Sequence, residues 1–453
     1  MPQWCINKRL CTVLVAGFCG VVITLAQTGS VQQAADLLRK GRADEAKNLL
    51  LECLRDDPHN QAIHGVLGQI AFSQQEFAEA VEHFQKAPVF LAKQHQLVHN
   101  YAEALLETKS PDAAIRVLEL IPPENAEAQF ECGLLLARHN QFLAAEKHFQ
   151  LAENGYPQPR LVAYDLALAQ FRAGEFAKSA ATLESLRRQT LPDGDVLNLL
   201  GEAYLEAGES RKALDTLKEA IEKNPRDERN YVAVAKLCTD ENRPARGLPL
   251  LDQGLRLLPN SYRLLLERGD LRLSAGQYPG AESDYRRAGE IQPESDSPKI
   301  GLAVVHLEIH SYPQAEAELQ QVLRSSPSNF MVHYLLGELY IREGQNAEAV
   351  KYLEQAAASG FAPAHNELGK LYLKSNDLSS ATREFETAIK LDPDDTTPYY
   401  QLSILYRRSG EKEKAQMALD RVKSLNDAQR SLGPVRSVMQ RMRKFQVEDA
   451  VRQ

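Results

Sequence analysis

Small side chains recur at a fixed interval along almost the whole chain, and this period limits the possible folds more than any other feature. Ala34, Gly68 and Ala102 stand 34 residues apart, and the interval continues through the chain with two shorter steps, which end at Gly133 and Gly369. A period of this length is typical of a stacked repeat protein. Such a protein binds along a surface, because each repeat contacts only its neighbours.

Each repeat is predicted to form two amphipathic helices. In residues 194–227, Leu197, Leu200 and Tyr204 have the spacing of one helix face. A turn that contains glycine follows, and Pro225 ends the second helix, because proline cannot continue a helix. The same arrangement repeats in the other units.

Two further columns of residues keep the same register. A second small residue follows the first after twelve positions, and a large apolar residue follows four positions later, as with Ala213 and Leu217 after Gly201. Small residues allow the paired helices to approach closely. The large residue is expected to fill the space between neighbouring units, since protein interiors are close-packed.

This pattern resembles the tetratricopeptide repeat (TPR) family, whose unit of 34 residues is a helix-turn-helix. The resemblance covers about residues 27–429 in twelve units, and it implies an all-α fold, a right-handed α-solenoid. Two units are shortened, near Pro122 and near Gly360, where we expect small changes of superhelical angle and no break. The proline near the end of the family's unit is present at Pro58, Pro157, Pro225, Pro259, Pro293, Pro327 and Pro393.

Residues 1–26 differ in kind from the repeats. Lys8 and Arg9 precede an apolar run, which ends at Ala26. This order resembles a secretory signal, while an uncleaved anchor or a buried first helix are the alternatives. An anchor is conceivable because about 17 apolar residues are the shortest spanning length. Both a signal and an anchor predict repeats outside the cytoplasm, periplasmic, secreted or membrane-anchored.

Residues 430–453 are predicted to be a capping helix and a polar tail. Gly433 and Pro434 precede one apolar stripe, and proline is favoured at the first position of a helix. A terminal repeat needs a polar outer surface, so residues 434–450 suit a cap. The alternative is a basic amphipathic helix for a membrane or a partner.

The composition excludes several functional classes. The net charge of −8, with basic and acidic residues interspersed, argues against nucleic acid as the main partner. No phosphate loop, dinucleotide fingerprint or HExxH motif is present. Because almost no residues lie outside the repeats, we predict no catalytic domain, no enzyme activity and no cofactor.

Histidines and cysteines provide no further site. The pairs His95/His99 and His306/His310 have the spacing that places two imidazoles on one helix face, but no third zinc ligand is fixed, so no metal site is predicted. The cysteines of the repeats lie in distant units and are expected to be buried free thiols. These cysteines are Cys53, Cys132 and Cys238.

The resemblance places four positions of each first helix on the concave surface. In the fourth and fifth units these positions hold Phe130, Leu134, Tyr164, Leu168 and Phe171. We expect a contiguous apolar and aromatic patch there, and exposed patches of this kind mark binding sites. The alternative is that some of these rings pack against adjacent helices.

The sequence therefore predicts a non-enzymatic, monomeric scaffold of the cell envelope that binds a peptide or protein in its concave groove. Charges around the patch would supply selectivity. One alternative is an accessory subunit of a glycan-modifying or envelope-assembly complex. The others are an enzyme, and self-assembly through the ends of the stack.

Overall fold

The computed structural model describes residues 29–91, 94–189 and 193–432. Within these ranges every regular element is a helix and there is no strand. The chain divides into two compact units, one ending at Glu209 and the other beginning at Ser210. The all-α solenoid of helix-turn-helix repeats that the sequence predicts is confirmed. The expected signal or anchor (1–26) and capping helix (434–450) lie outside the described residues.

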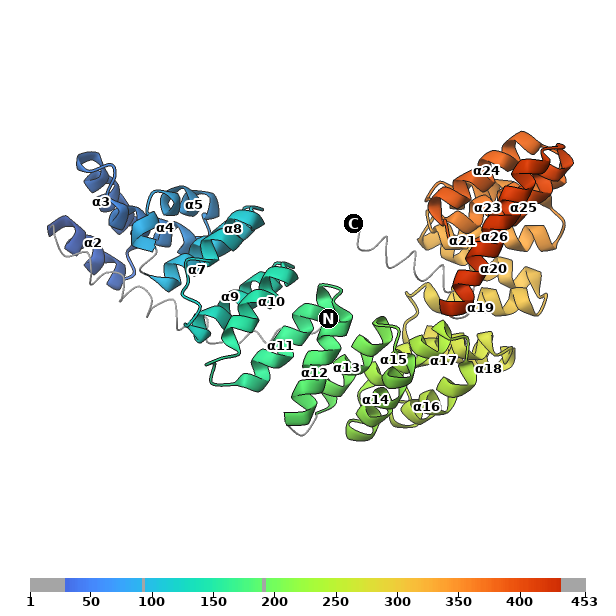
Figure 1. Ribbon diagram of the computed structural model, residues 1–453, viewed down its shortest axis with the longest axis horizontal. Coiled ribbons are helices and arrows are strands. Elements are labelled where there is room, and N and C mark those ends of the chain that lie inside the picture. The colour runs from blue at the N-terminus through green and yellow to red at the C-terminus, as the bar shows by residue number, and fades with distance from the viewer. Residues whose placement is uncertain (1–28, 92–93, 190–192, 433–453) are drawn as a thin grey trace. The chain divides into compact units, whose positions relative to one another are not determined.

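The first unit is a string of paired helices (Figure 1). Contacts join the two helices of each pair, as in α4 with α5 and α9 with α10. In chain order the helices are α2 (Gly29–Arg39), α3 (Ala43–Asp56), α4 (Gln61–Ser73), α5 (Phe77–Gln85), α6 (Pro88–Leu91), α7 (His95–Glu107), α8 (Pro111–Leu118), α9 (Ala126–Arg138), α10 (Phe142–Ala152), α11 (Pro159–Arg172), α12 (Phe176–Gln189) and α13 (Gly194–Glu206).

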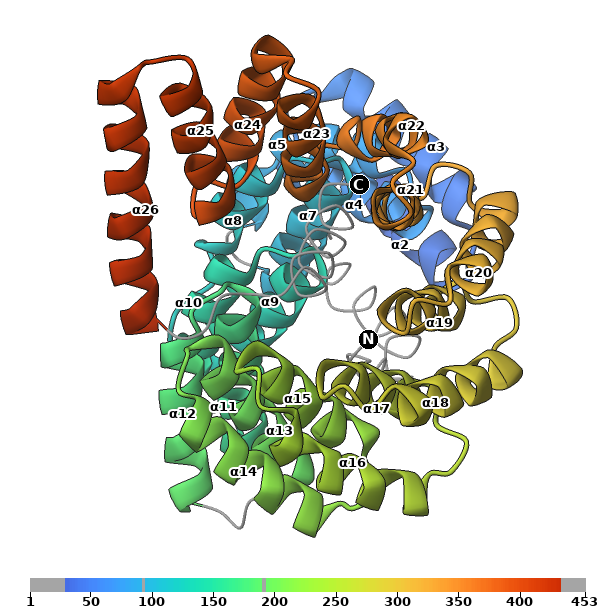
Figure 2. The ribbon, with the colours of Figure 1, turned by 90° about the vertical axis from the view of Figure 1, so that its right-hand side faces the viewer.

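The second unit repeats the same pairing, and its long last helix packs along α25 (Figure 2). The helices are α14 (Ser210–Lys223), α15 (Glu228–Asp240), α16 (Pro244–Leu257), α17 (Tyr262–Ser274), α18 (Tyr278–Ile291), α19 (Ser297–Glu308), α20 (Tyr312–Ser325), α21 (Phe330–Arg342), α22 (Asn346–Ala357), α23 (Ala362–Lys374), α24 (Leu378–Leu391), α25 (Thr396–Arg408) and α26 (Lys412–Leu432).

The first helices of successive repeats lie side by side within each unit. In the first unit α4 contacts α7, α7 contacts α9, and α11 contacts α13. In the second unit α15, α17, α19 and α21 follow one another in the same way, as do α23 and α25. We call this array of helices the first-helix layer of each unit. It is the layer on which the sequence places the binding positions.

The small residue that defines the period receives the large residue of its own repeat. A Cβ atom on Gly133 would lie 2.6 Å from the ring of Phe149, and one on Gly369 would lie 2.5 Å from the ring of Phe385. The large residue therefore packs within a repeat as well as between repeats. Tyr285 does both, because its ring also lies where a Cβ on Gly301 of the next repeat would stand.

The turn between repeats is held by side chains of the helix that follows it. His64 Nε2 lies 3.1 Å from the carbonyl oxygen of Pro58, and His333 Nε2 lies 2.8 Å from that of Pro327. The Tyr231 hydroxyl donates to the carbonyl oxygen of Pro225 at 2.9 Å. In each case the side chain stands six residues after the proline. These contacts satisfy a carbonyl that the preceding helix leaves without a partner.

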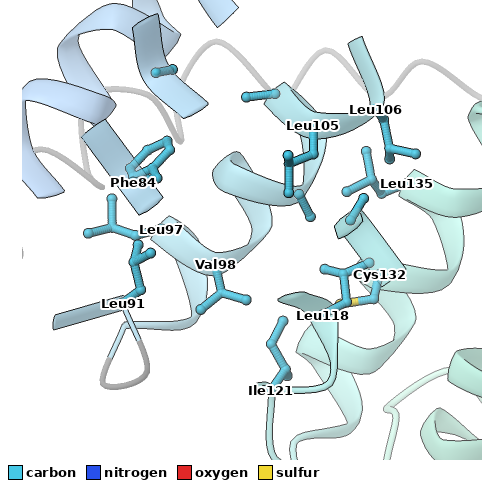
Figure 3. Close-up of a cluster of buried hydrophobic side chains, with 14 of the residues drawn as sticks. Phe84, Leu91, Leu97, Val98, Leu105, Leu106, Leu118, Ile121, Cys132 and Leu135 are labelled. Atoms are coloured by element: carbon cyan, nitrogen blue, oxygen red, sulfur yellow. The ribbon is translucent and has the colours of Figure 1, made fainter. Parts of the chain in front are cut away.

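Leucine, valine and phenylalanine side chains from successive helices form the core of the first unit (Figure 3). Phe84, Leu97 and Val98 come from α5 and α7, while Leu135 comes from α9. This core continues from one repeat to the next, as expected where stacking buries the apolar faces. Cys132 lies within it as a free thiol.

Three features differ from the sequence-based expectations. The short helix α6 was not expected, and its Phe90 ring fits against the bare backbone of Gly65. The thiols of Cys132 and Cys238 are free and buried as predicted, but Cys53 is only half-buried. Among the described residues, no helix combines the length and apolar character needed to span a membrane.

Candidate interaction surface

The five residues predicted to form an exposed patch are divided by the structure between the core and the surface. Phe130 and Leu134 lie on α9, and Tyr164, Leu168 and Phe171 lie on α11. Phe130 is only 4% exposed and Leu168 only 7% exposed. The other three are half-buried. The prediction of a contiguous exposed patch is therefore wrong for Phe130 and Leu168.

The burial of Phe130 results from a turn that covers its ring. Tyr156 precedes α11, and its ring centroid lies 4.3 Å from that of Phe130. On the other side Phe149 of α10 lies 5.6 Å away, centroid to centroid. The ring thus belongs to an aromatic cluster inside the unit, which is the alternative that the sequence left open. Pairs of this kind contribute about 0.5–1.5 kcal/mol beyond burial.

Phe171 is also engaged within the unit. Its ring meets that of Phe176 edge to face at 5.3 Å, across the turn between α11 and α12. Leu134 packs at the margin of the same core as Phe130. Leu134, Tyr164 and Phe171 nevertheless keep part of their surface accessible. Their role in binding a partner stays a prediction.

Acidic side chains surround the turn that covers Phe130, and sequence reasoning missed them. Glu127 and Glu131 lie on α9, and Asp165 lies on α11. Burial raises the pKa of the Tyr156 hydroxyl, and the charges of these three carboxylates raise it further. We call Glu127, Glu131 and Asp165 the acidic cluster. Its members are four and thirty-four residues apart, a signal that the helical and repeat periods contain.

The turn itself approaches the start of α9. A Cβ atom on Gly155 would lie 3.3 Å from the Cβ of Ala126, the residue before Glu127. Gly155 has a φ of +130°, a conformation that L side chains rarely adopt. Glycine at this position therefore lets the turn place Tyr156 between α9 and α11.

Asp165 is the most unusual member of the acidic cluster. It is 7% exposed, and it makes no hydrogen bond or ion pair with any residue that the structure describes. Burial raises its pKa to about 7. Burial, followed by the charge of Glu127, also raises the pKa of Glu131, although Glu131 is exposed. The cluster thus lacks a compensating cation of its own.

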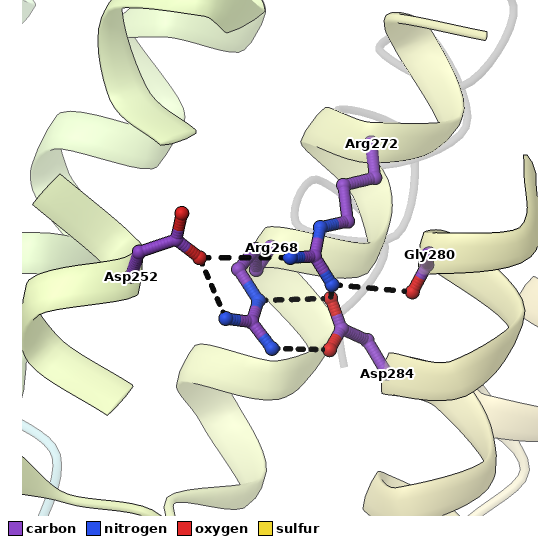
Figure 4. A network of polar contacts seen from close by, with 5 residues as sticks. All are labelled: Asp252, Arg268, Arg272, Gly280 and Asp284. Atoms are coloured by element: carbon purple, nitrogen blue, oxygen red, sulfur yellow. Dashed lines mark hydrogen bonds and ion pairs between the residues drawn. The ribbon is translucent and has the colours of Figure 1, made fainter. Parts of the chain in front are cut away.

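The second unit contains a buried carboxylate of the opposite kind. Asp284 of α18 accepts two hydrogen bonds from Arg268, at 2.6 and 3.0 Å, and one from Arg272 at 2.8 Å (Figure 4). Arg268 also donates to Asp252 of α16 at 2.6 Å. Because every charge here has a partner, this network connects α16, α17 and α18 and offers no free group to a ligand.

A shallow depression on α18 is likewise occupied by paired charges. Arg286 donates to Glu282 at 2.7 Å, and Arg287 donates to Asn260 at 3.2 Å. Glu290 and Ile291 complete the lining. The depression is open to solvent and holds no convergent catalytic groups.

The histidine pairs do not form metal sites in the described part of the chain, where no group of three His, Cys, Asp or Glu residues could hold an ion. His95 and His99 both lie on α7, and burial lowers the pKa of His99 to about 4. The expectation that His306 and His310 share a helix face is wrong, because α19 ends at Glu308 and His310 adopts a φ of +61°.

Two models of the tetratricopeptide repeat match most of the chain. One matches residues 31–94, 164–228, 240–296 and 300–363, and the other matches residues 340–403. Together the matched residues exceed half of the chain. The matches agree with the helix pairs seen in the structure.

Curated relatives are similar over shorter stretches. The BBSome complex member BBS4 of Bos taurus is 23% identical over 224 residues, 48% of this chain and 42% of that protein. The antiviral innate immune response effector IFIT1 of Homo sapiens is 23% identical over 241 residues, 46% of this chain and 50% of that protein. The alignments thus span half or less of these relatives.

Among solved structures, yeast Tom70 resembles this chain with a TM-score of 0.50 and 17% sequence identity. The match covers 93% of this chain and 94% of that one. At this identity the similarity concerns the fold alone.

Proposed function

Because the chain belongs to the tetratricopeptide repeat family, we propose that it is a non-enzymatic scaffold that binds a protein or peptide partner on the first-helix layer of its first unit. One observation carries this proposal. Leu134, Tyr164 and Phe171 remain partly accessible on α9 and α11, beside carboxylates that have no cation of their own. Apolar anchors next to unpaired charges are the composition of a protein-binding surface.

The finer features of the prediction belong to the same proposal. Residues 1–26 would direct the repeats out of the cytoplasm as a cleaved signal or an anchor, and the repeats would act as a monomer in the cell envelope. N-terminal sequencing of the mature chain, together with fractionation of cells, tests the location. A mature chain that retains Met1 in the cytoplasmic fraction would contradict it.

The binding surface is tested with a pair of matched tyrosine variants. Tyr164 and Tyr400 both stand at the fifth position of a first helix, on α11 and α25, and Tyr400 is exposed. We expect Tyr164→Ala to reduce recovery of co-purified partners by about tenfold, the effect of one anchor of about 1.4 kcal/mol. Tyr400→Ala should leave recovery unchanged.

Quantitative mass spectrometry of tagged full-length chains measures the recovery, and circular dichroism checks that both variants keep native helicity. Full recovery with Tyr164→Ala would overturn the assignment to the first unit. Equal loss in both variants would overturn it as well, because binding would then not be specific to α11. Tyr164 replaces Phe130 as the probe here, since truncation of the buried Phe130 would destabilise the unit.

A further inference from the structure

We infer that the acidic cluster receives a lysine or arginine side chain of the bound polypeptide, so that the partner of this scaffold carries a basic residue at the contact. This inference rests on the proposed function and specifies the partner's chemistry. It is carried by the placement of three carboxylates around one tyrosine, together with the isolation of the buried member, Asp165.

The geometry brings together residues from two helices and a turn. Glu127 and Glu131 are one helical turn apart on α9, so they point to the same side of that helix. The turn before α11 lies against the start of α9 and places Tyr156 beside Phe130. Asp165 follows one and a half turns into α11. All three charges act on the Tyr156 hydroxyl.

No cation of the protein neutralises the cluster. Neither Glu127, Glu131 nor Asp165 forms an ion pair with a described residue, although carboxylates elsewhere in the unit do so, such as Glu119 with Lys147 at 3.0 Å. Three uncompensated carboxylates produce a local negative potential, which attracts cations and excludes anions.

The burial of Asp165 indicates a ligand that reaches into the cluster. A carboxylate that is withdrawn from water without a hydrogen-bond partner costs free energy, and such a group normally has a partner or loses its charge. Asp165 is more than nine-tenths buried and has no partner among the described residues. A cationic head group that donates hydrogen bonds would restore the charged state and recover this cost.

The ligand is an organic cation and not a metal ion. The described residues contain no set of three ligands spaced to hold a metal. The rings of Tyr156 and Phe130 adjoin the carboxylates, and aromatic faces attract ammonium and guanidinium groups. A long aliphatic side chain with a charged end matches a site that combines rings with carboxylates.

The test uses fluorescein-labelled decalysine and decaarginine as probes of the full-length chain, with decaglutamate as the negative probe. In the double variant Glu131→Gln and Asp165→Asn, two charges are removed with little change of shape. We expect fluorescence anisotropy to show at least tenfold weaker binding of both cationic probes. Decaglutamate should bind neither the native chain nor the variant.

A matched double variant controls for overall charge. Glu107→Gln with Glu119→Gln removes the same charge from the same unit, outside the acidic cluster, and should change the affinity by less than twofold. Equal weakening by the two double variants would overturn the inference, because attraction would then depend only on net charge. No weakening by the cluster variant would also overturn it.

Folding and the proposed function are separated from this result. Thermal unfolding checks each variant, and if the double variant does not fold, the exposed Glu131→Gln alone must still weaken probe binding at least threefold. Selective loss of probe binding together with full partner recovery by Tyr164→Ala would support the cation site and reject the proposed binding surface. The reverse pair of results would reject the cation site alone.

Discussion

Two buried aspartates, one in each unit, are treated in opposite ways by the same fold. Asp165 is 7% exposed and has no partner among the described residues, while Asp284 is 2% exposed and is held by two arginines. The comparison shows that similar burial can serve two purposes. The paired aspartate connects helices, and the unpaired one remains available to a ligand.

The difference follows from the neighbours at equivalent positions of the repeat. Where the eighth repeat has Arg268, Arg272 and Asp284, the fifth repeat has Leu166, Gln170 and Thr182. The Thr182 hydroxyl donates to Gln170 at 2.8 Å, so a neutral hydrogen bond replaces the ion pairs. The fifth repeat therefore has no cation near its helices that could reach Asp165.

The largest effect is expected at the paired aspartate. Asp284→Asn removes the charge that Arg268 and Arg272 share, and a buried ion pair that loses one partner costs about 3–5 kcal/mol. We expect the free energy of unfolding to fall by about 3 kcal/mol, because both arginines retain some contact with water. Urea unfolding followed by circular dichroism measures this change. An unchanged midpoint would show that the network contributes nothing to the second unit.

The unpaired aspartate should respond in the opposite direction. Its pKa is raised to about 7 from an ordinary value of 3.8, so the folded chain retains a proton that the unfolded chain has lost. Stability must therefore decrease as pH rises from about 4 to 7, by at most about 1.4 kcal/mol per pH unit. Asp165→Asn abolishes this decrease, and we expect it to stabilise the chain by about 2 kcal/mol at pH 8.

The same unfolding experiment, repeated between pH 4 and pH 8, tests this prediction. The stabilisation should disappear near pH 4, where the native aspartate is also neutral. Equal or lower stability of the Asn variant at pH 8 would mean that Asp165 finds a partner in solution, which would contradict the comparison with Asp284.

The smallest effect is expected at the outer carboxylate of the paired network. Asp252 receives a hydrogen bond from Arg268 but its side chain is exposed. Exposed ion pairs contribute only about 0.2–1 kcal/mol. Asp252→Asn should therefore lower the free energy of unfolding by less than about 1 kcal/mol, and less still in high salt. A loss as large as that of Asp284→Asn would show that burial does not determine the strength of these pairs.

Sequence reasoning predicted the helix pairs closely. In residues 194–227 it placed two helices that end near Gly208 and Pro225, and the structure has α13 and α14 there. Spacing and breakers suffice for this result, because helix ends depend on local chemistry. The short helix α6 was missed, since four residues are too few to show a period.

The candidate surface was predicted less well. The helical period correctly placed Phe130 and Tyr164 on the same layer, but it could not show that Tyr156 would cover only Phe130. The acidic cluster was missed for the same reason. Its residues stand on two helices and a turn, and their proximity depends on how the turn packs against α9.

The sequence by itself determined the repeat, the helix pairs and the small residues that admit a large neighbour, because each of these depends on spacing within one unit. Only the tertiary structure decided which rings are covered, which thiols are buried and which aspartate is paired. Those outcomes depend on contacts between residues of different helices. A period of 34 residues fixes where a side chain begins, but its exposure and charge depend on what the neighbouring helix and turn place beside it.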